Sequence, residues 1–293
     1  MKKAYALTFG DEHSGALRSL LAPGSLRHVG EGDEETQKVS LTILQKYLWA
    51  CFKNMLEGIH HYTSRFILLD PGDMLQGYRN VWATKLVLPL FDDQMEANLR
   101  IKGELVKAGA YEARLCHGTD FHKQEYCDHE MEIARRLRAN HDKDDTLKGI
   151  PSIPAKYNDR FNVRILDKVI NMVHSHSSVQ DYPSVPMDKE IEGAWLKEAL
   201  KQAPHADILI RGHIHPTTFA ASTRDDKQGF FNLCWQLPDS YQSTRKARFY
   251  RSYPMLGCVL LEITEEPMPH GVRLIPFKYP PPDMEMRVEN IKW

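Results

Sequence analysis

Closely spaced pairs of histidine and aspartate are the residues of this chain best suited to chemistry. In Asp-x-His and His-x-His, two side chains two residues apart in extended backbone point the same way and can converge on one site. Imidazole and carboxylate together suit zinc, manganese, iron or nickel, and no thiolate site is evident. The pairs are Asp11 with His13, Asp120 with His122, His174 with His176, and His213 with His215, and Asp73 stands alone.

Each of these residues follows a short apolar run that predicts a buried strand. In an α/β sheet, ligand sites form outside the carboxyl ends of the strands. One such motif alone is usually a turn or a cap. Five successive strands that deliver His or Asp to one edge indicate a metal site. The predicted strands are Tyr5–Phe9, Arg65–Leu69, Tyr111–Cys116, Ile165–Val173 (interrupted by Asp167 and Lys168) and Ile208–Ile210.

Amphipathic stretches separate these strands and predict helices at Val39–Ile59, Gln94–Ala108 and Glu190–Gln202. The alternation of strands and helices predicts an α/β fold. After Gly212, three strand-like segments indicate a run of antiparallel strands, in a second sheet packed on the first. They are Phe230–Gln236, Met255–Ile263 and Val272–Phe277.

We expect one domain over residues 1–293, with an insertion at 123–160. The insertion holds a charged, helix-like stretch at Glu130–Asn140 and a loop rich in Asp, Lys and Pro. It is either a solvated surface segment or a lid that selects the substrate.

Composition excludes some classes of protein. The 38 Lys and Arg residues nearly balance the 39 Asp and Glu residues, so net charge demands neither nucleic acid nor an anionic membrane as partner. No apolar run reaches the length of about 18 residues that a transmembrane helix needs, and the N-terminal apolar run is too short for a signal peptide. Five scattered cysteines indicate free thiols and a cytoplasmic protein. Nothing in the sequence indicates an oligomeric state.

The order of the motifs resembles the calcineurin-like metallophosphoesterase superfamily, whose pattern is DxH, GDx, GNH(D/E), a lone His and GHxH. The resemblance implies a four-layered α/β/β/α fold, with two mixed sheets flanked by helices and the last strands in the second sheet. Trp235-Gln236-Leu237-Pro238 further resembles phage and prophage members. The matching segments are Asp11-Glu12-His13, Gly72-Asp73, Gly118-Thr119-Asp120-Phe121-His122, His174 or His176, and Gly212-His213-Ile214-His215.

The resemblance also implies a role for each matching residue in binding two divalent metal ions, for which manganese is favoured. Water activated by the two cations would attack phosphorus in line. We favour His174 over His176 because it comes first after the strand. The implied ligands are Asp11, His13 and His215 for the first metal, Asp73 as a bridge, and His213 with His174 or His176 for the second.

One segment departs from the family pattern. GTDFH lacks the Asn that ligates the second metal, so Asp120 or Thr119 could replace it, and His122 could act as the general acid. A weaker second site or a mononuclear enzyme therefore stays open.

The substrate is indicated only by the basic and aromatic stretch Tyr241–Tyr253, which can stack bases and contact phosphates or can be a solvated loop. Arg245 and Arg248 within it, and Arg211, are candidate phosphate contacts, although Arg211 could equally be solvated or paired. We therefore favour a hydrolase of the phosphodiesterase or nuclease type, acting on nucleic acid or a nucleotide. The alternatives are a phosphomonoesterase acting on a small metabolite or phosphoprotein, and a catalytically weak metal-binding protein.

Overall fold

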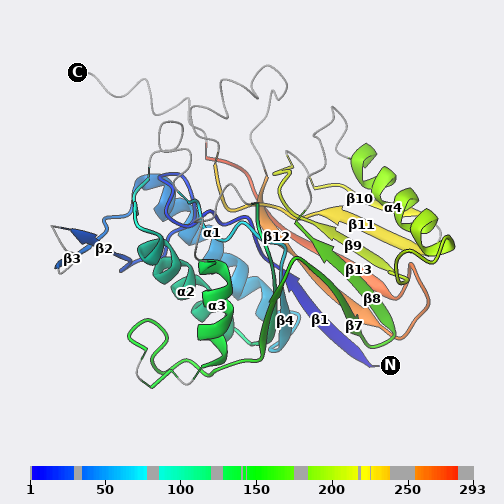
Figure 1. Cartoon of the computed structure of the whole chain (residues 1–293), viewed down its shortest axis with the longest axis horizontal. Coiled ribbons are helices and arrows are strands. Elements are labelled where there is room, and N and C mark those ends of the chain that lie inside the picture. The colour runs from blue at the N-terminus through cyan, green and yellow to red at the C-terminus, as the bar shows by residue number, and fades with distance from the viewer. Residues whose placement is uncertain are drawn as a thin grey trace, which may run out of the picture.

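Two mixed β-sheets lie between helices in the computed structural model (Figure 1), which describes residues 2–29, 35–77, 86–119, 128–139, 141–142, 144–174, 184–216, 219–224, 226–237 and 255–282. In the first sheet, β12 runs antiparallel to both neighbours and the last four strands are parallel. Its spatial order is β13 (Val272–Tyr279), β12 (Leu256–Thr264), β1 (Lys3–Thr8), β4 (Phe66–Asp70), β5 (Ala110–Cys116) and β6 (Ala155–Asn158).

The second sheet has a parallel centre and antiparallel edges. Strands β11, β9 and β8 are parallel, and each edge strand is antiparallel to its neighbour. The spatial order is β10 (Ala221–Arg224), β11 (Lys227–Phe231), β9 (Ile208–Arg211), β8 (Lys168–Val173) and β7 (Arg160–Ile165). Strands β2 (Leu26–Val29) and β3 (Glu35–Lys38) pair separately.

Helices α1 (Ile43–His60), α2 (Phe91–Lys107) and α3 (His129–Arg138) lie on the first sheet, and α4 (Ser184–Ala199) lies on the second (Figure 1). Helix α1 begins with a capping box, in which the Thr42 hydroxyl accepts from the Gln45 N–H and the Gln45 amide oxygen accepts from the Thr42 N–H. These bonds satisfy two N–H groups near the start of the helix.

The side chains of β1 point alternately towards the helices and towards the second sheet. Leu7 packs into the large cluster that joins the first sheet to α1–α3, whereas Ala6 packs between the two sheets. Successive side chains of a strand point to opposite faces, so both faces of β1 are covered. On the outer face of the second sheet, Met187 of α4 packs on Leu209 of β9. The predicted α/β fold, two mixed sheets flanked by helices, is confirmed.

The prediction that the last strands of the chain all belong to the second sheet is wrong. Only β11 lies in that sheet, beside β9 and parallel to it, while β12 and β13 extend the first sheet. Nearly every residue of β12 is buried, so it needs a layer on each face and lies next to β1. Its partner is about 250 residues away in sequence, and local periodicity does not identify such a partner. The predicted strand Ile165–Val173 is divided by a turn into β7 and β8.

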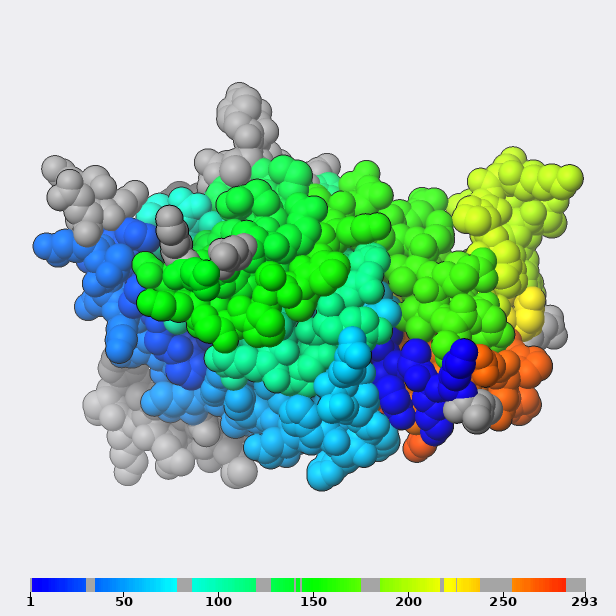
Figure 2. All heavy atoms as spheres, turned by 90° about the horizontal axis from the view of Figure 1, so that it is seen from below, coloured from blue at the N-terminus to red at the C-terminus, as the bar shows by residue number. Residues whose placement is uncertain are grey.

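The region predicted as an insertion, 123–160, supplies structural elements where it is described. Helix α3 packs against α2 and β6, and β6 forms an edge of the first sheet. In the space-filling view of Figure 2, its green atoms form a continuous surface with the teal atoms of α2 and β5. A lid role for the region stays a prediction. Within the described parts of the chain, no helix combines the length and apolar character that crossing a membrane requires.

Candidate metal centre

Six His and Asp side chains gather where the parallel strands of both sheets end. They form two groups, and within each group one ligand atom per residue lies within 4.8 Å of the others. The first group follows β1 and β9, and the second follows β4, β8 and β9. The groups are Asp11 with His13 and His215, and Asp73 with His174 and His213.

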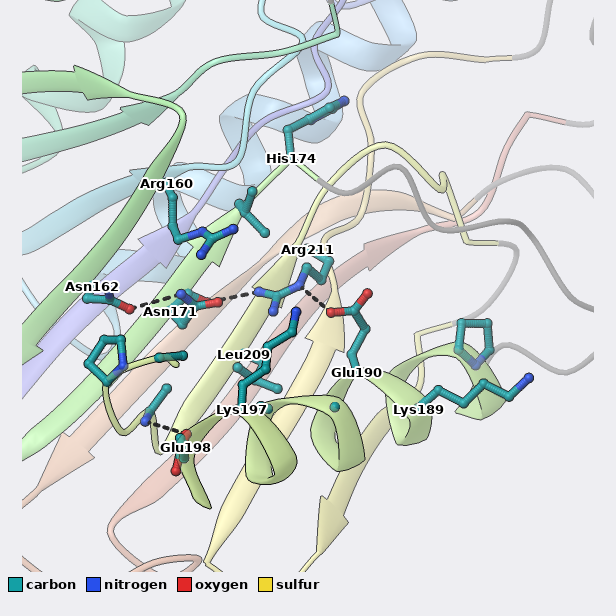
Figure 3. Close-up of a pocket in the computed structure, with 17 residues that line it drawn as sticks. Arg160, Asn162, Asn171, His174, Lys189, Glu190, Lys197, Glu198, Leu209 and Arg211 are labelled. Carbon is teal, nitrogen blue, oxygen red and sulfur yellow. Dashed lines mark hydrogen bonds and ion pairs between the residues drawn. The ribbon is translucent and has the colours of Figure 1, made fainter. Parts of the chain in front are cut away.

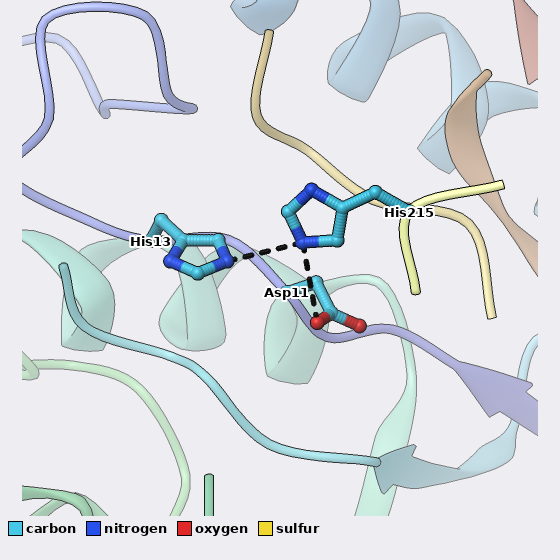
Figure 4. Close-up of side chains that lie close together, drawn as sticks. All are labelled: Asp11, His13 and His215. Carbon is cyan, nitrogen blue, oxygen red and sulfur yellow. Dashed lines mark hydrogen bonds and ion pairs between the residues drawn. The ribbon is translucent and has the colours of Figure 1, made fainter. Parts of the chain in front are cut away.

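The first group brings two imidazoles and a carboxylate to one point (Figure 4). The Nε2 atoms of His13 and His215 lie 3.1 Å apart, and His215 Nε2 lies 3.5 Å from Asp11 Oδ1. Asp11 is fully buried, and no described residue hydrogen-bonds to its Oδ2 atom. An unsatisfied buried carboxylate oxygen is costly, and a cation bound here would remove that cost. The donor set of nitrogen and oxygen atoms fits a divalent transition metal.

The second group is arranged around Asp73. His174 Nε2 lies 3.0 Å from Asp73 Oδ2, and His213 Nδ1 lies 3.8 Å from the same oxygen. His174 Nδ1 lies 2.9 Å from the carbonyl oxygen of Pro71, which can only accept, so Nδ1 donates. In the neutral imidazole this bond leaves the Nε2 lone pair directed at the centre, which is the tautomer a metal ligand needs.

Two backbone hydrogen bonds join the groups. The N–H of His213 donates to Asp11 Oδ1 over 3.0 Å, and the N–H of His13 donates to the carbonyl of Asp73 over 3.1 Å. Gly212 lies next to a residue of each group. A Cβ added to it would stand 2.8 Å from His174 Nδ1 and 3.1 Å from Asp11 Oδ2. The close approach of the groups therefore requires glycine at this position.

The backbone of the site is strained. Positive φ is uncommon outside glycine, and such strain concentrates at functional sites, where the surrounding structure must hold it. Seven described non-glycine residues have positive φ, and five of them belong to the two groups. These are Asp11 (φ 53°), His13 (49°), Asp73 (53°), His213 (75°) and His215 (48°).

Neighbouring side chains raise the pKa of two of the histidines. Burial alone would lower the pKa of His174, but the charge of Asp73 and its hydrogen bond raise it to about 9. Burial also opposes the charge of His215, but Cys234 and Asp11 raise its pKa to about 10. Carboxylates that favour a proton at these nitrogens favour a metal cation at the same place.

Thr119 and Glu130 position Asp73. Thr119 was one of the two candidates for the missing Asn ligand, whereas Glu130 was not predicted to belong to the site. The N–H of Thr119 donates to Asp73 Oδ1 over 2.6 Å, and its hydroxyl lies 3.1 Å from the same atom. Glu130, buried on α3, accepts from the N–H of Met74 over 3.0 Å and from the N–H of Gly118 over 2.9 Å. Burial and the charge of Asp73 raise the pKa of Glu130 to about 8. Glu130 thus fixes the loops after β4 and β5 together.

A buried ion cluster lies behind both groups. Lys102 of α2 is fully buried and contacts the carboxylates of Glu12 and Asp70. Burial disfavours the Lys102 charge, but the two carboxylates outweigh it and raise the pKa of Lys102. Burial, together with the charge of Asp70, raises the pKa of Glu12 well above its usual range. Because Glu12 lies between Asp11 and His13 in sequence, Lys102 ties the first loop to the second.

The structure places only some of the remaining predicted residues. Arg211 is buried, pairs with Glu190 over 3.1 Å and donates to the carbonyls of Asn171 and Ile210. It lines a groove beside His174. The predicted residues that lie outside the described parts of the chain are Asp120, His122, His176, Arg245 and Arg248.

Comparison with known proteins gives low similarity. No protein-family model matches the chain, and no curated protein matches its sequence. Among solved structures, zinc-bound Vps29 from Entamoeba histolytica is 14% identical, with 93% of this chain and 99% of that chain covered and a TM-score of 0.40.

Two further structures are described as phosphoesterases. An archaeal phosphodiesterase is 11% identical, with 93% of this chain and 99% of that chain covered and a TM-score of 0.41. Yfce, a phosphoesterase from E. coli, is 12% identical, with 92% and 96% covered and a TM-score of 0.35. At such identities and TM-scores, the case for a function rests on the residues of this chain.

Proposed function

We propose that the chain is a metal-dependent phosphoesterase, a hydrolase that cleaves a phosphate ester with a metal-activated water. The observation that carries the proposal is the pair of three-residue groups at the strand ends, joined by the bond from the His213 N–H to Asp11. Two adjacent sites with nitrogen and carboxylate ligands are the arrangement that a two-metal hydrolase needs.

In this proposal each group holds one divalent cation. Manganese is favoured, and zinc, iron and nickel suit the same ligands. Asp73 is proposed to contribute to both sites, and Asp11 to the first through Oδ1, which lies 3.5 Å from His215 Nε2. When bound, the metals lower the pKa of water and neutralise charge on the phosphoryl oxygens.

The chain's other residues hold these ligands in place. The Pro71 carbonyl fixes the ring of His174, and Thr119 fixes the carboxylate of Asp73. Such supporting bonds keep a site in its productive geometry. The sequence pattern GTDFH further leads us to propose His122 as the general acid and Asp120 as the replacement for the missing Asn ligand.

For the substrate, we propose a phosphodiester of a nucleic acid or nucleotide. The basic and aromatic stretch Tyr241–Tyr253, with Arg245 and Arg248, supports this choice. The competing proposal is a phosphomonoester of a small metabolite or phosphoprotein.

Hydrolysis of two aryl esters tests both the function and the substrate class. Bis(p-nitrophenyl) phosphate and p-nitrophenyl phosphate are supplied separately, with manganese, to the wild type and to Asp73→Ala. The matched control is Asp167→Ala, because Asp167 is a half-exposed aspartate in the turn at the opposite end of β8 from His174. Loss of a ligand is expected to lower the rate by about 100-fold or more.

Activity that survives in Asp167→Ala and disappears in Asp73→Ala supports the proposal, and the preferred ester selects between the two substrate classes. Metal binding without turnover of either ester would instead identify a metal-binding protein. Equal activity in both variants would reject the proposed site.

A further inference from the structure

A groove of about 640 Å³ opens beside the second group of ligands, between α4 and the outer face of the second sheet (Figure 3). Helix α4 packs over β10 and β11, and among the described residues the outer side chains of β7, Arg160, Asn162 and Arg164, are exposed. His174 lines one end of the groove. A molecule bound at the candidate metal centre could therefore extend into it.

The floor of the groove is polar. Along β8, Ile170 and Met172 point into the core between the sheets, while Asn171 lies on the outer face. Its side-chain N–H donates over 2.9 Å to the amide oxygen of Asn162, the residue opposite on β7. A sheet face that carried only a covering helix would be apolar, so amides here fit a face that meets water or a polar ligand.

The charges around the groove do not cancel. Its two acidic residues already have cationic partners, because Glu190 pairs with Arg211 over 3.1 Å and Glu198 pairs with Lys227 over 2.9 Å. Arg160 and Lys197 also line the groove and are exposed, and no described acidic side chain pairs with either. The groove therefore has an excess of positive charge.

The positions of these cations agree with a site for an anion. Figure 3 shows the Arg160 side chain between His174 and Arg211, and the Lys197 amine reaching from α4 towards Arg211. Arg211 is buried and fixed by its bonds to Glu190 and to backbone carbonyls. Exposed cations over a rigid polar floor bind phosphate through charged hydrogen bonds.

We propose that this groove binds a second phosphate group of the substrate. The centre would then prefer esters that carry another phosphate beside the bond to be cleaved. This inference rests on the proposed function and narrows its substrate class. The second phosphate belongs either to a nucleoside bisphosphate or to the next nucleotide of an oligonucleotide.

The test compares two esters that differ only in that group: thymidine 5′-(p-nitrophenyl phosphate) and the same compound with a 3′-phosphate. We expect the wild type to have a higher kcat/KM for the 3′-phosphorylated ester. Arg160→Gln and Lys197→Gln should each reduce this preference by about tenfold, the effect of losing one charged hydrogen bond. Neither should change the rate on the ester without the 3′-phosphate. Lys46→Gln removes an exposed lysine of α1, beyond the first sheet, and should leave the preference intact.

Binding gives a second readout that needs no turnover. Calorimetry should show that manganese-loaded protein binds thymidine 3′,5′-bisphosphate more tightly than thymidine 5′-phosphate, and that Arg160→Gln removes the difference. If kcat/KM rises further with oligothymidylates of increasing length, the natural substrate is an oligonucleotide. If kcat/KM stops rising once the second phosphate is present, the natural substrate is a nucleoside bisphosphate.

The two proposals fail in different ways. If neither ester is hydrolysed, the proposed function fails, and the calorimetric comparison still tests the groove. If both esters are hydrolysed with equal kcat/KM in the wild type, the groove proposal is overturned and the phosphoesterase remains.

Discussion

His174 donates its Nδ1 hydrogen to the carbonyl oxygen of Pro71, 2.9 Å away, so its Nε2 atom is held 3.0 Å from the carboxylate of Asp73. Pro71 precedes Asp73 by two residues, so one short loop after β4 supplies both the carboxylate and the group that orients the imidazole opposite it. The histidine comes from the second sheet and the loop from the first. The bond therefore fixes the relative position of the two sheets at the candidate metal centre.

This arrangement predicts pH-dependent metal binding. The pKa of His174, 6.5 in the ordinary side chain, is raised to about 9 in the fold, so its ion pair stabilises the metal-free protein fully below about pH 6.5 and is lost as the pH rises through 9. A metal requires the deprotonated nitrogen, so manganese affinity should rise across the same window and binding should release protons.

Calorimetric titration with manganese in buffers of different ionisation enthalpy measures that release. His174→Gln should reduce it, whereas His270→Gln, which changes an exposed histidine between β12 and β13, should not. Proton release near zero at pH 7 in the wild type would contradict the account.

Glu130→Gln tests the residue that holds the two ligand loops together. The pKa of Glu130 is about 8, so the comparison is made above pH 8, where the carboxylate is ionised. One carboxylate oxygen would then become an NH₂ group facing an N–H donor, so one charged hydrogen bond is lost, worth about 1.5–3 kcal/mol. Because this bond positions the loop of Asp73, manganese affinity should fall by about 10- to 100-fold.

The matched control for this substitution is Glu132→Gln, on the same helix, where the carboxylate pairs with Arg135 at the surface. Metal titration and urea unfolding distinguish the roles. Lower stability with unchanged metal affinity in Glu130→Gln would make Glu130 purely structural.

The strand ends that carry the site were predictable from sequence, and the supporting residues were not. Glycine, aspartate and histidine after an apolar run indicate a strand followed by a tight turn, and this signal located Asp11, Asp73 and His213 correctly at the sheet edge. Glu130 belongs to a charged stretch that looks like any solvated helix. Its burial depends on where α3 packs, which periodicity alone does not reveal.

The pairing of strands that lie far apart in the chain could likewise not be predicted from the sequence. The nearly continuous apolar run predicts that Leu256–Thr264 is a strand, but its register against β1, with Lys3 opposite Thr264, joins segments that lie far apart in the sequence. A single sequence holds no signal for that contact. A buried lysine such as Lys102 was missed for the same reason, because lysines are almost never fully buried unless paired and its partners lie on other segments.

Lys102→Met should strongly destabilise the protein, since it leaves two carboxylates buried without a counter-ion. The expected loss is about 3–5 kcal/mol in the free energy of unfolding, measured with urea at pH 7.5. Without the ammonium, the carboxyl pKa values rise further, so the loss should shrink as the pH falls and the groups take up protons.

Lys107→Met, at the exposed end of the same helix, should cost less than about 1 kcal/mol, because Lys107 pairs with Glu104 at the surface. A loss of equal size in the two variants would show that the buried ion cluster contributes no more to stability than a surface ion pair does.

Gly212→Ala should damage the site directly. The new Cβ would stand 2.8 Å from His174 Nδ1 and 3.1 Å from Asp11 Oδ2, so both groups must shift. We expect a loss of bound metal and a fall in hydrolysis of about tenfold or more, since ligand positions tolerate only small displacements.

Gly149→Ala is a control in which the added Cβ contacts no other atom. Gly149 has a φ of 75°, and an added Cβ meets nothing within 4 Å. Its substitution should cost about 1–2 kcal/mol of stability with metal content unchanged. Full metal content in Gly212→Ala would refute the close contact seen at this glycine.

The most direct test of the account counts metal ions. Metal-free protein is dialysed against manganese, and the bound metal per chain is measured by mass spectrometry for the wild type, His215→Ala and His213→Ala. We expect two ions in the wild type and one in each variant, because each histidine belongs to a different group. A wild type that binds no manganese, zinc, iron or nickel, or two variants that keep both ions, would contradict the two-metal centre.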